Sequence, residues 1–299
     1  MNYANRLVEN GVTIFLFHGV EDGVCTEVRN YTRKHIPKTD FCTYLEELKV
    51  CGTPVSMDDV VADRRGEWPL PPYAFTITFD DGFENNLSVA APVLAEIGIP
   101  AMFYVTTDFI DSNRMSWIDR IEYVVEQVTS GRVVMPWGEQ YFSNPAERVG
   151  LLKDIRHYAK KHPTSDLDAM ASLVQEQLGF PETWSADHPL DRKLTWAQVS
   201  ELAAGSSFSV GGHSHNHNIL SFLDDTALED EIDVSLEMLR EKGGIDITHY
   251  SYPEGLAHCY DERVIAVLKS RGIVCAPNAI DGENLSDVDL FNLFRVTVV

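Results

Sequence analysis

Hydrophobic and polar positions alternate along most of this chain in two repeating patterns. Short apolar runs predict strands, and they occupy residues 12–17, 73–79, 101–106, 207–210, 249–252, 273–276 and 293–298. Segments with apolar residues at helical spacing lie between these runs, at residues 39–50, 86–97, 195–204, 226–242 and 261–271. Strands that alternate with helices in this way predict an α/β fold whose strands are mainly parallel.

Residues 111–192 interrupt the alternation. Helical patterns near residues 117–129, 145–161 and 165–178 surround a short β-like piece at 132–142. No long linker rich in glycine, serine or proline divides the chain. We therefore expect a single domain over residues 1–299, with a mostly helical insertion at about 111–192 between two strands.

The composition limits the classes of partner. A net charge of −22 argues against nucleic acid or an anionic membrane, because both require basic patches. Neither a signal peptide nor a membrane-spanning run is visible in the sequence. The 5 cysteines are scattered and never form a CxxC pair, which fits reduced thiols better than a disulfide framework. These features predict a cytoplasmic protein.

Two motifs at predicted strand ends provide the candidate chemistry. Thr78-Phe79-Asp80-Asp81-Gly82 ends one strand, and His213-Ser214-His215-Asn216-His217 follows another. Each alone has a structural interpretation, as a capped turn or a solvated loop. Because parallel strands bring their carboxyl ends to one face of the fold, we expect the two motifs to lie close together. One carboxylate and two imidazoles form a divalent-metal site that leaves positions open for water and substrate.

Two further strand ends bring polar groups to the same face. His18 follows the first predicted strand, and Tyr252-Pro253-Glu254-Gly255 follows the strand at 249–252. Four separate strand ends with polar or titratable groups are stronger evidence for a functional site than any single motif.

These motifs resemble those of the polysaccharide deacetylases of carbohydrate esterase family four. The family's Thr-Phe-Asp-Asp-Gly motif matches residues 78–82 at every position, and its His-Ser/Thr-x-x-His motif matches residues 213–217. Phe17-His18-Gly19-Val20 resembles the Tyr-His-x-Val start of many bacterial members. The resemblance covers about residues 12–110 and 194–299. It implies a distorted (β/α) barrel of about seven strands.

The resemblance also implies roles for the motif residues. Asp81, His213 and His217 would hold the metal, while Asp80 would be the base that activates water. Zinc is the default ion, although such a site also accepts iron, cobalt or manganese. His215 lies between the ligands and is expected to point away from the metal, in the second shell or at the surface.

The chain departs from the family pattern at the third motif. An Arg-x-Pro-Tyr sequence, whose arginine pairs with the base, is replaced by Ser251-Tyr252-Pro253-Glu254-Gly255. We expect Tyr252 and Glu254 to contact the substrate, and the Glu254 N–H to stabilise the oxyanion. Arg295 would replace the missing arginine, bind substrate, or lie at the surface of an edge strand.

A second departure concerns the catalytic acid. The family's late Leu-x-His motif is absent, since no histidine follows Cys275. His18 is the first candidate to protonate the leaving amine and His258 the second, although His18 could equally be a structural histidine.

The sequence therefore predicts metal-dependent hydrolysis of an N-acetyl or N-formyl amide on an amino sugar. The cytoplasmic prediction favours a soluble or nucleotide-linked sugar, as used in making capsule or lipopolysaccharide. Two alternatives are a catalytically degenerate sugar-binding protein and a non-sugar, allantoinase-like amidase on the same fold. Three tryptophans of the insertion would either stack on the sugar or pack in a core: Trp117, Trp137 and Trp184.

Overall fold

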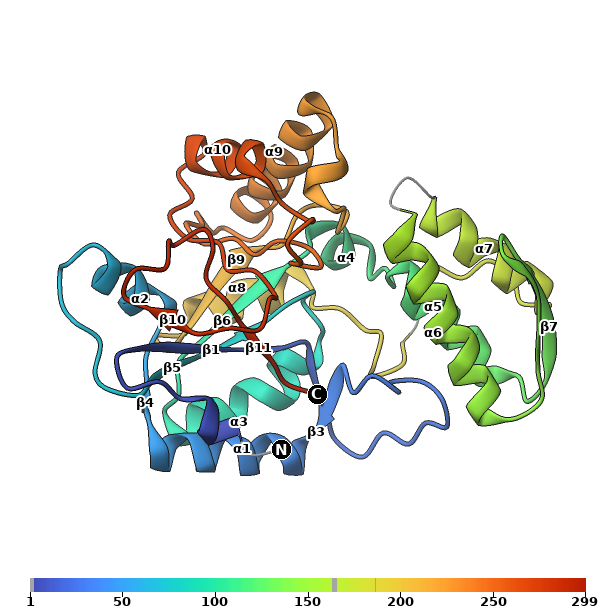
Figure 1. Ribbon diagram of the computed structural model, residues 1–299, viewed down its shortest axis with the longest axis horizontal. Helices are drawn as coiled ribbons and strands as arrows, with labels where there is room; N and C mark the ends of the chain where they lie inside the picture. The colour runs from blue at the N-terminus through green and yellow to red at the C-terminus, as the bar shows by residue number, and fades with distance from the viewer. Residues whose placement is uncertain (1–2, 163–165, 186) are drawn as a thin grey trace.

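The computed structural model describes residues 3–162, 166–185 and 187–299. At its centre lies a 7-stranded sheet with the order β10-β1-β5-β6-β9, while β4 pairs with β5 and β11 with β1 (Figure 1). All of its pairings are parallel except that of β10 with β1. The strands are β1 (Gly11–Phe17), β4 (Thr53–Pro54), β5 (Ala74–Phe79), β6 (Ala101–Val105), β9 (Phe208–Gly212), β10 (Asn284–Leu285) and β11 (Val296–Thr297). The predicted α/β class with mainly parallel strands is confirmed.

The central strands are covered on both faces. Every residue of β5 and β6 is buried, as continuous apolar runs in parallel sheets predict. In Figure 1 the helices α1 and α3 lie on one side of the sheet, and α9 and α10 lie on the other. The helices of this part are α1 (Lys38–Cys51), α2 (Met57–Arg64), α3 (Ala91–Ile97), α4 (Thr107–Ser112), α8 (Trp196–Ala204), α9 (Asp225–Glu241) and α10 (Glu262–Ser270).

The predicted strands at 249–252 and 273–276 are wrong as regular strands. The sheet continues there only through the single bridges Gly212↔Tyr250 and His249↔Cys275. Pro253 lacks an N–H and follows at once, so the first segment turns into a loop after these pairings. The predicted strand at 293–298 is likewise reduced to β11, because Leu293 and Arg295 bond residues 278 and 280 of the preceding loop.

Several short elements escaped the sequence patterns. They are the parallel pair β2 (Gly19–Glu21) and β3 (His35–Pro37), the helices α2 and α4, the short turns η1 (Tyr3–Arg6) and η3 (Leu220–Phe222), and β4 and β10. The predicted helix at 86–97 is divided into a π-helical turn, η2 (Asn86–Ala90), and α3. Elements of two to eight residues are too short to show a clear hydrophobic period.

The insertion folds as a lobe beside the sheet (Figure 1). It contains α5 (Trp117–Gln127), the hairpin of β7 (Gly131–Met135) and β8 (Gly138–Phe142), α6 (Pro145–Lys161) and α7 (Leu167–Gln177). Its apolar side chains form a separate core, which also includes Val28 from the β2–β3 connection. The helix predicted from residue 165 begins at Leu167 in the described chain, and residue 165 lies outside the described residues. No helix in the described ranges is long and apolar enough to cross a membrane.

Candidate metal centre

Asp81, His213 and His217 converge where β5 and β9 end. The Nε2 atoms of His217 and His213 lie 3.3 Å and 3.6 Å from Asp81 Oδ1. One ligand atom from each of the three residues lies within 4.8 Å of the others. Asp81 Oδ1 is buried and has no hydrogen-bond partner among the described residues. Such an oxygen, flanked by two imidazole nitrogens, is suited to a divalent cation.

Hydrogen bonds hold the His213 imidazole and the turn that carries His217. His213 Nδ1 donates a hydrogen bond to the Ser251 carbonyl at 3.0 Å, which leaves Nε2 free to bind a metal. Burial lowers the pKa of His213 to about 4, so its imidazole is neutral at pH 7. Ser214 Oγ accepts the His217 N–H at 2.9 Å and closes the turn between the two histidines. The ligand loop is therefore held in shape by its own hydrogen bonds.

Unusual backbone conformations gather at this site. Four non-glycine residues have φ in the left-handed region: Asp81 (74°), Ser214 (63°), His217 (60°) and Glu254 (59°). This conformation is unfavourable for residues with a Cβ and persists where surrounding structure enforces it. The concentration of such residues around one cavity marks it as a functional centre.

Asp80, next to the candidate ligand Asp81, is paired with a distant arginine. Arg295 donates from Nη1 to Asp80 Oδ1 at 2.8 Å and from Nη2 to Oδ2 at 2.7 Å. Both side chains are buried, with exposed fractions of 0% for Arg295 and 4% for Asp80. Burial raises the pKa of Asp80, but the charge and hydrogen bonds of Arg295, together with the charges of His213 and His18, hold it below its usual value. Asp80 is therefore a carboxylate that stays ionised in a desolvated site.

Two residues that sequence reasoning missed complete this pair. Ser251 Oγ accepts a hydrogen bond from Arg295 Nη2 at 2.9 Å and lies 3.3 Å from Asp80 Oδ2. Arg295 Nε donates to the Asn278 carbonyl. Ser251 stands where the family has its arginine, which is a signal that could have singled it out. Asn278 had no such signal, because it acts through its main chain.

A cavity of about 330 Å³ opens over this cluster. His18, Asp80, Asp81, His213 and His217 all contribute to its lining. A neighbouring cavity of about 340 Å³ shares lining residues with it, including Trp117, Arg156, Lys160, His217 and Glu254. The two form one cleft between the sheet and the lobe, since they are lined by residues of both.

The two candidate acids occupy different parts of this cleft. His18 lines the cavity that contains Asp80 and Asp81, whereas His258 lines the neighbouring one. Burial lowers the pKa of His18. His258 instead stacks on Phe222, with ring centroids 6.0 Å apart.

The residues expected to bind substrate are placed differently. Glu254 lines both cavities. Tyr252 is fully buried, donates to the Phe291 carbonyl at 3.0 Å and does not line the cleft, so its position does not fit a substrate contact. Arg295 is equally buried and contacts Asp80 instead of the cleft. His215 lies outside the ligand cluster, with its Nδ1 2.9 Å from Thr107 Oγ1.

Of the three tryptophans in the insertion, Trp117 lines both cavities. Trp137 packs against Tyr158 within the lobe, with ring centroids 4.7 Å apart. Trp184 is covered by the Arg120 guanidinium, 3.6 Å from its ring centroid. Only Trp117 of these three is therefore placed for contact with a bound molecule.

Known structures share this architecture. IcaB from Ammonifex degensii aligns with a TM-score of 0.60 and 16% identity, over 98% of this chain and 94% of that chain. The Streptococcus pyogenes deacetylase PplD, solved in complex with acetate, aligns with a TM-score of 0.62 and 14% identity over the same shares. A de-N-acetylase from Aggregatibacter actinomycetemcomitans aligns with a TM-score of 0.62 and 15% identity, over 95% of this chain and 94% of that chain. At such identities these likenesses show the fold. No curated protein sequence matches.

The family assignment rests on a sequence model together with the paired motifs. The model described as "Polysaccharide deacetylase" matches residues 69–276, which include the Asp-Asp-Gly and His-x-x-x-His motifs. Asp81, His213 and His217 of these motifs form the cluster at the ends of β5 and β9. This chain therefore belongs to the polysaccharide deacetylase family.

Proposed function

We propose that this protein is a metal-dependent N-deacetylase that removes an acetyl or formyl group from an amino sugar. The observation that carries the proposal is the convergence of Asp81, His213 and His217 beside an Asp80 carboxylate in one cavity. Asp81, His213 and His217 would hold one divalent ion, with zinc as the first choice for a carboxylate and two imidazoles. Such an ion lowers the pKa of water and polarises an amide carbonyl when it is bound.

Asp80 is proposed as the general base. Its carboxylate is ionised by its pairing with Arg295 and lines the cavity, so it can accept a proton from water at neutral pH. Asp81 differs because its Oδ1 faces the two imidazoles without a hydrogen-bond donor. Adjacent carboxylates thus have separate tasks, one as a base and one as a ligand.

The Glu254 N–H is proposed to stabilise the oxyanion of the tetrahedral intermediate. Glu254 lines the cavity next to His217, and its positive φ together with that of Gly255 shapes the loop. Among the described residues no acceptor is recorded for this N–H. A main-chain donor left free at a cleft is the usual component of an oxyanion hole.

His18 is proposed as the group that protonates the leaving amine. It lines the same cavity as Asp80, whereas His258 lines the neighbouring one. Only protonated His18 can donate a proton. Because burial lowers the pKa of His18, this protonated fraction is small at neutral pH and grows as the pH falls.

We further propose that the substrate is a soluble or nucleotide-linked amino sugar in the cytoplasm, handled during the synthesis of a surface polysaccharide. The composition of the chain and its resemblance to deacetylases support this assignment. The missing motif arginine is one reason to consider a degenerate sugar-binding protein, and the pairing of Arg295 with Asp80 weakens that reason. An allantoinase-like activity has no supporting observation of its own.

The decisive experiment combines metal analysis with acetate release from a panel of nucleotide-linked N-acetylated sugars and small ureides. We expect about one divalent ion per chain and chelator-sensitive acetate release from a sugar. Metal and sugar binding without any turnover would favour the binding protein. Absence of metal would contradict the proposed ligand set.

A further inference from the structure

The cleft contains a cationic site in a chain that is otherwise strongly acidic. The net charge of the chain is −22, and such a field disfavours anions unless the binding site itself is positive. Arg156 and Lys160 lie one helical turn apart on α6, which places them on the same face of that helix. Both line the cavity over Asp81, His213 and His217, called the metal cavity below, and both also line its neighbour. They therefore lie where the two cavities meet.

Lys160 lacks a counter-charge. No ion pair or hydrogen bond of its ammonium group is found in the part of the chain that the structure describes, and its side chain is exposed. Arg156 is held by Glu122, with Nη2 2.9 Å from Oε1, and its side chain keeps 27% exposure. The Lys160 ammonium group is thus free to pair with a ligand. The Arg156 guanidinium is already fixed in the wall of the cleft by Glu122.

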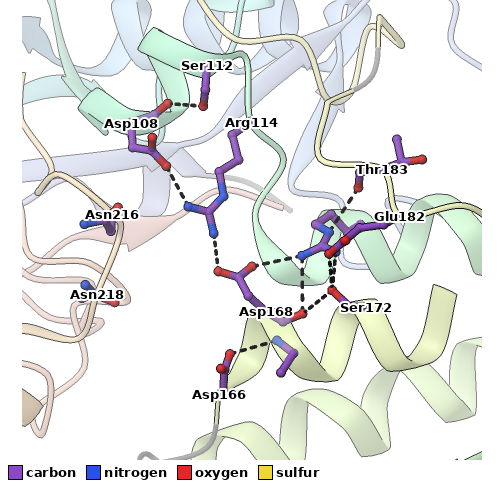
Figure 2. Close-up of polar contacts among 12 residues, drawn as sticks. Asp108, Ser112, Arg114, Asp166, Asp168, Ser172, Glu182, Thr183, Asn216 and Asn218 are labelled. Carbon is purple, nitrogen blue, oxygen red and sulfur yellow. Dashed lines mark hydrogen bonds and ion pairs between the residues drawn. The ribbon is translucent and has the colours of Figure 1, made fainter. Parts of the chain in front are cut away.

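Two of the three acidic residues that line the neighbouring cavity, Asp166 and Asp168, are compensated, and Glu254 is the third. Figure 2 shows Asp168 joined to Arg114, which also bonds Asp108 at 2.8 Å. Asp166 caps α7 and accepts the Ala169 N–H at 2.9 Å (Figure 2). Their negative charges are therefore matched by a guanidinium and by a helix N-terminus.

A third cation, Lys34, lines the cavity over Asp81, His213 and His217. Lys34 lines it and bonds Asp119, whose other oxygen is 3.9 Å from Lys193 Nζ. The partly buried Lys34 and the buried Lys193 thus share one aspartate. The carboxylate of Asp80 is neutralised by Arg295, and that of Asp81 is committed to the proposed ligand set. Glu254 is the remaining acid in the lining of this cavity.

We propose that the substrate carries an anionic group, a phosphate or a carboxylate, which binds between Arg156 and Lys160 while its acylated amine lies at the metal centre. This inference rests on the proposed function and defines its substrate class. Charge-assisted hydrogen bonds from an arginine and a lysine are a common means of holding such groups. A neutral amino sugar would leave both cations without a ligand.

The test measures binding separately from turnover. Zinc-loaded protein carrying Asp80→Asn is titrated calorimetrically with N-acetylglucosamine 1-phosphate, the corresponding uronic acid, and the neutral methyl glycoside. We expect the better of the two anionic sugars to bind about 10-fold more tightly than the neutral one. The ranking of the phosphate and the carboxylate then identifies the anionic group.

The variants Lys160→Glu and Lys161→Glu provide a matched pair. They change the net charge equally on the last turn of α6, but only Lys160 lines the cleft. Lys160→Glu should abolish the preference for the anionic sugar, and Lys161→Glu should preserve it. Equal binding of neutral and anionic sugars, or equal effects of the two variants, would overturn the inference.

Metal-free protein titrated with inorganic pyrophosphate separates this inference from the proposed function. If no sugar binds but pyrophosphate does, with the same dependence on Lys160, the cationic site stands and the deacetylase proposal fails. If neutral sugars are bound and deacetylated as well as anionic ones, the function stands and the inference fails. Failure of both sugars and pyrophosphate to bind would overturn both.

Discussion

Arg295 and Asp80 are 215 residues apart in sequence and form a bidentate ion pair in the buried wall of the metal cavity. The arginine comes from the segment just before β11, and the aspartate follows β5. Because β1 lies between these strands and pairs with both, the C-terminal segment is brought beside the Asp-Asp-Gly turn. A positive charge that the family's third motif would supply thus reaches Asp80, the proposed base, from another part of the chain.

Asp80→Asn should abolish activity and leave the metal bound. An amide has nearly the shape of a carboxylate but cannot act as a base, so we expect kcat to fall by about 10²–10⁴. His217→Ala should lose both metal and activity, because it removes one of three ligands. Metal content after dialysis, measured beside acetate release, checks the assignment. Equal loss of metal in the two variants would mean that Asp80 is itself a ligand.

Arg295→Lys should move the acidic limb of the pH profile to higher pH. Arg295 lowers the pKa of Asp80, so weakening their pairing lets that pKa rise. The base must be deprotonated to work, and activity would therefore be lost earlier as the pH falls. The measurement is kcat/KM against pH at constant metal saturation. Lysine keeps a charge beside the buried carboxylate, whereas a neutral residue would cost about 3–5 kcal/mol of stability. An unchanged acidic limb would exclude Asp80 as the titrating base.

Removal of the metal should lower both activity and thermal stability. A chelator would stop acetate release, and added zinc at about 100 times its Kd would stabilise the fold by about 2.7 kcal/mol. For a chain of 299 residues that corresponds to a rise in Tm of roughly 4 °C. Thermal unfolding with and without zinc tests this, and His217→Ala is the control that should show little shift. A similar shift in that variant would place the stabilising ion elsewhere.

His18→Gln should reduce kcat by about 100-fold without loss of metal, if His18 protonates the leaving amine. His258→Gln is the matched control, since His258 lines the neighbouring cavity, which Asp80 and Asp81 do not line. In the unaltered protein the alkaline limb should reflect a pKa below that of an ordinary histidine, because burial lowers the pKa of His18. That limb should vanish in His18→Gln. Its persistence would show that another group is the acid.

Ser214→Ala should weaken metal binding by about 10–100-fold, as losses of groups that orient a ligand do. The hydroxyl accepts the His217 N–H and fixes the loop between the two histidines. Ser214→Gly also lacks the hydroxyl but relieves the positive φ of 63°, so it separates loss of the bond from backbone strain. Competition with a zinc indicator gives the affinity. Ser207→Ala, at an exposed position before β9, should have no effect.

The sequence by itself determined the α/β class, the family, and the two motifs that meet at the candidate metal centre. Alternation of apolar and polar residues is a local property, and so is the placement of a motif directly after a strand. Parallel strands then bring such motifs to one edge of the sheet, which is why Asp81, His213 and His217 could be predicted to converge.

Only the tertiary structure decided which distant groups complete the site. The contact of Arg295 with Asp80 depends on strand order, and the position of Lys160 above the cleft depends on how the lobe packs against the sheet. Neither the Arg295–Asp80 contact nor the position of Lys160 is marked by a periodic pattern of residues in the sequence. The reduction of the segments at 249–252 and 273–276 to single bridges has the same origin, because strand pairing depends on partners far away in the chain.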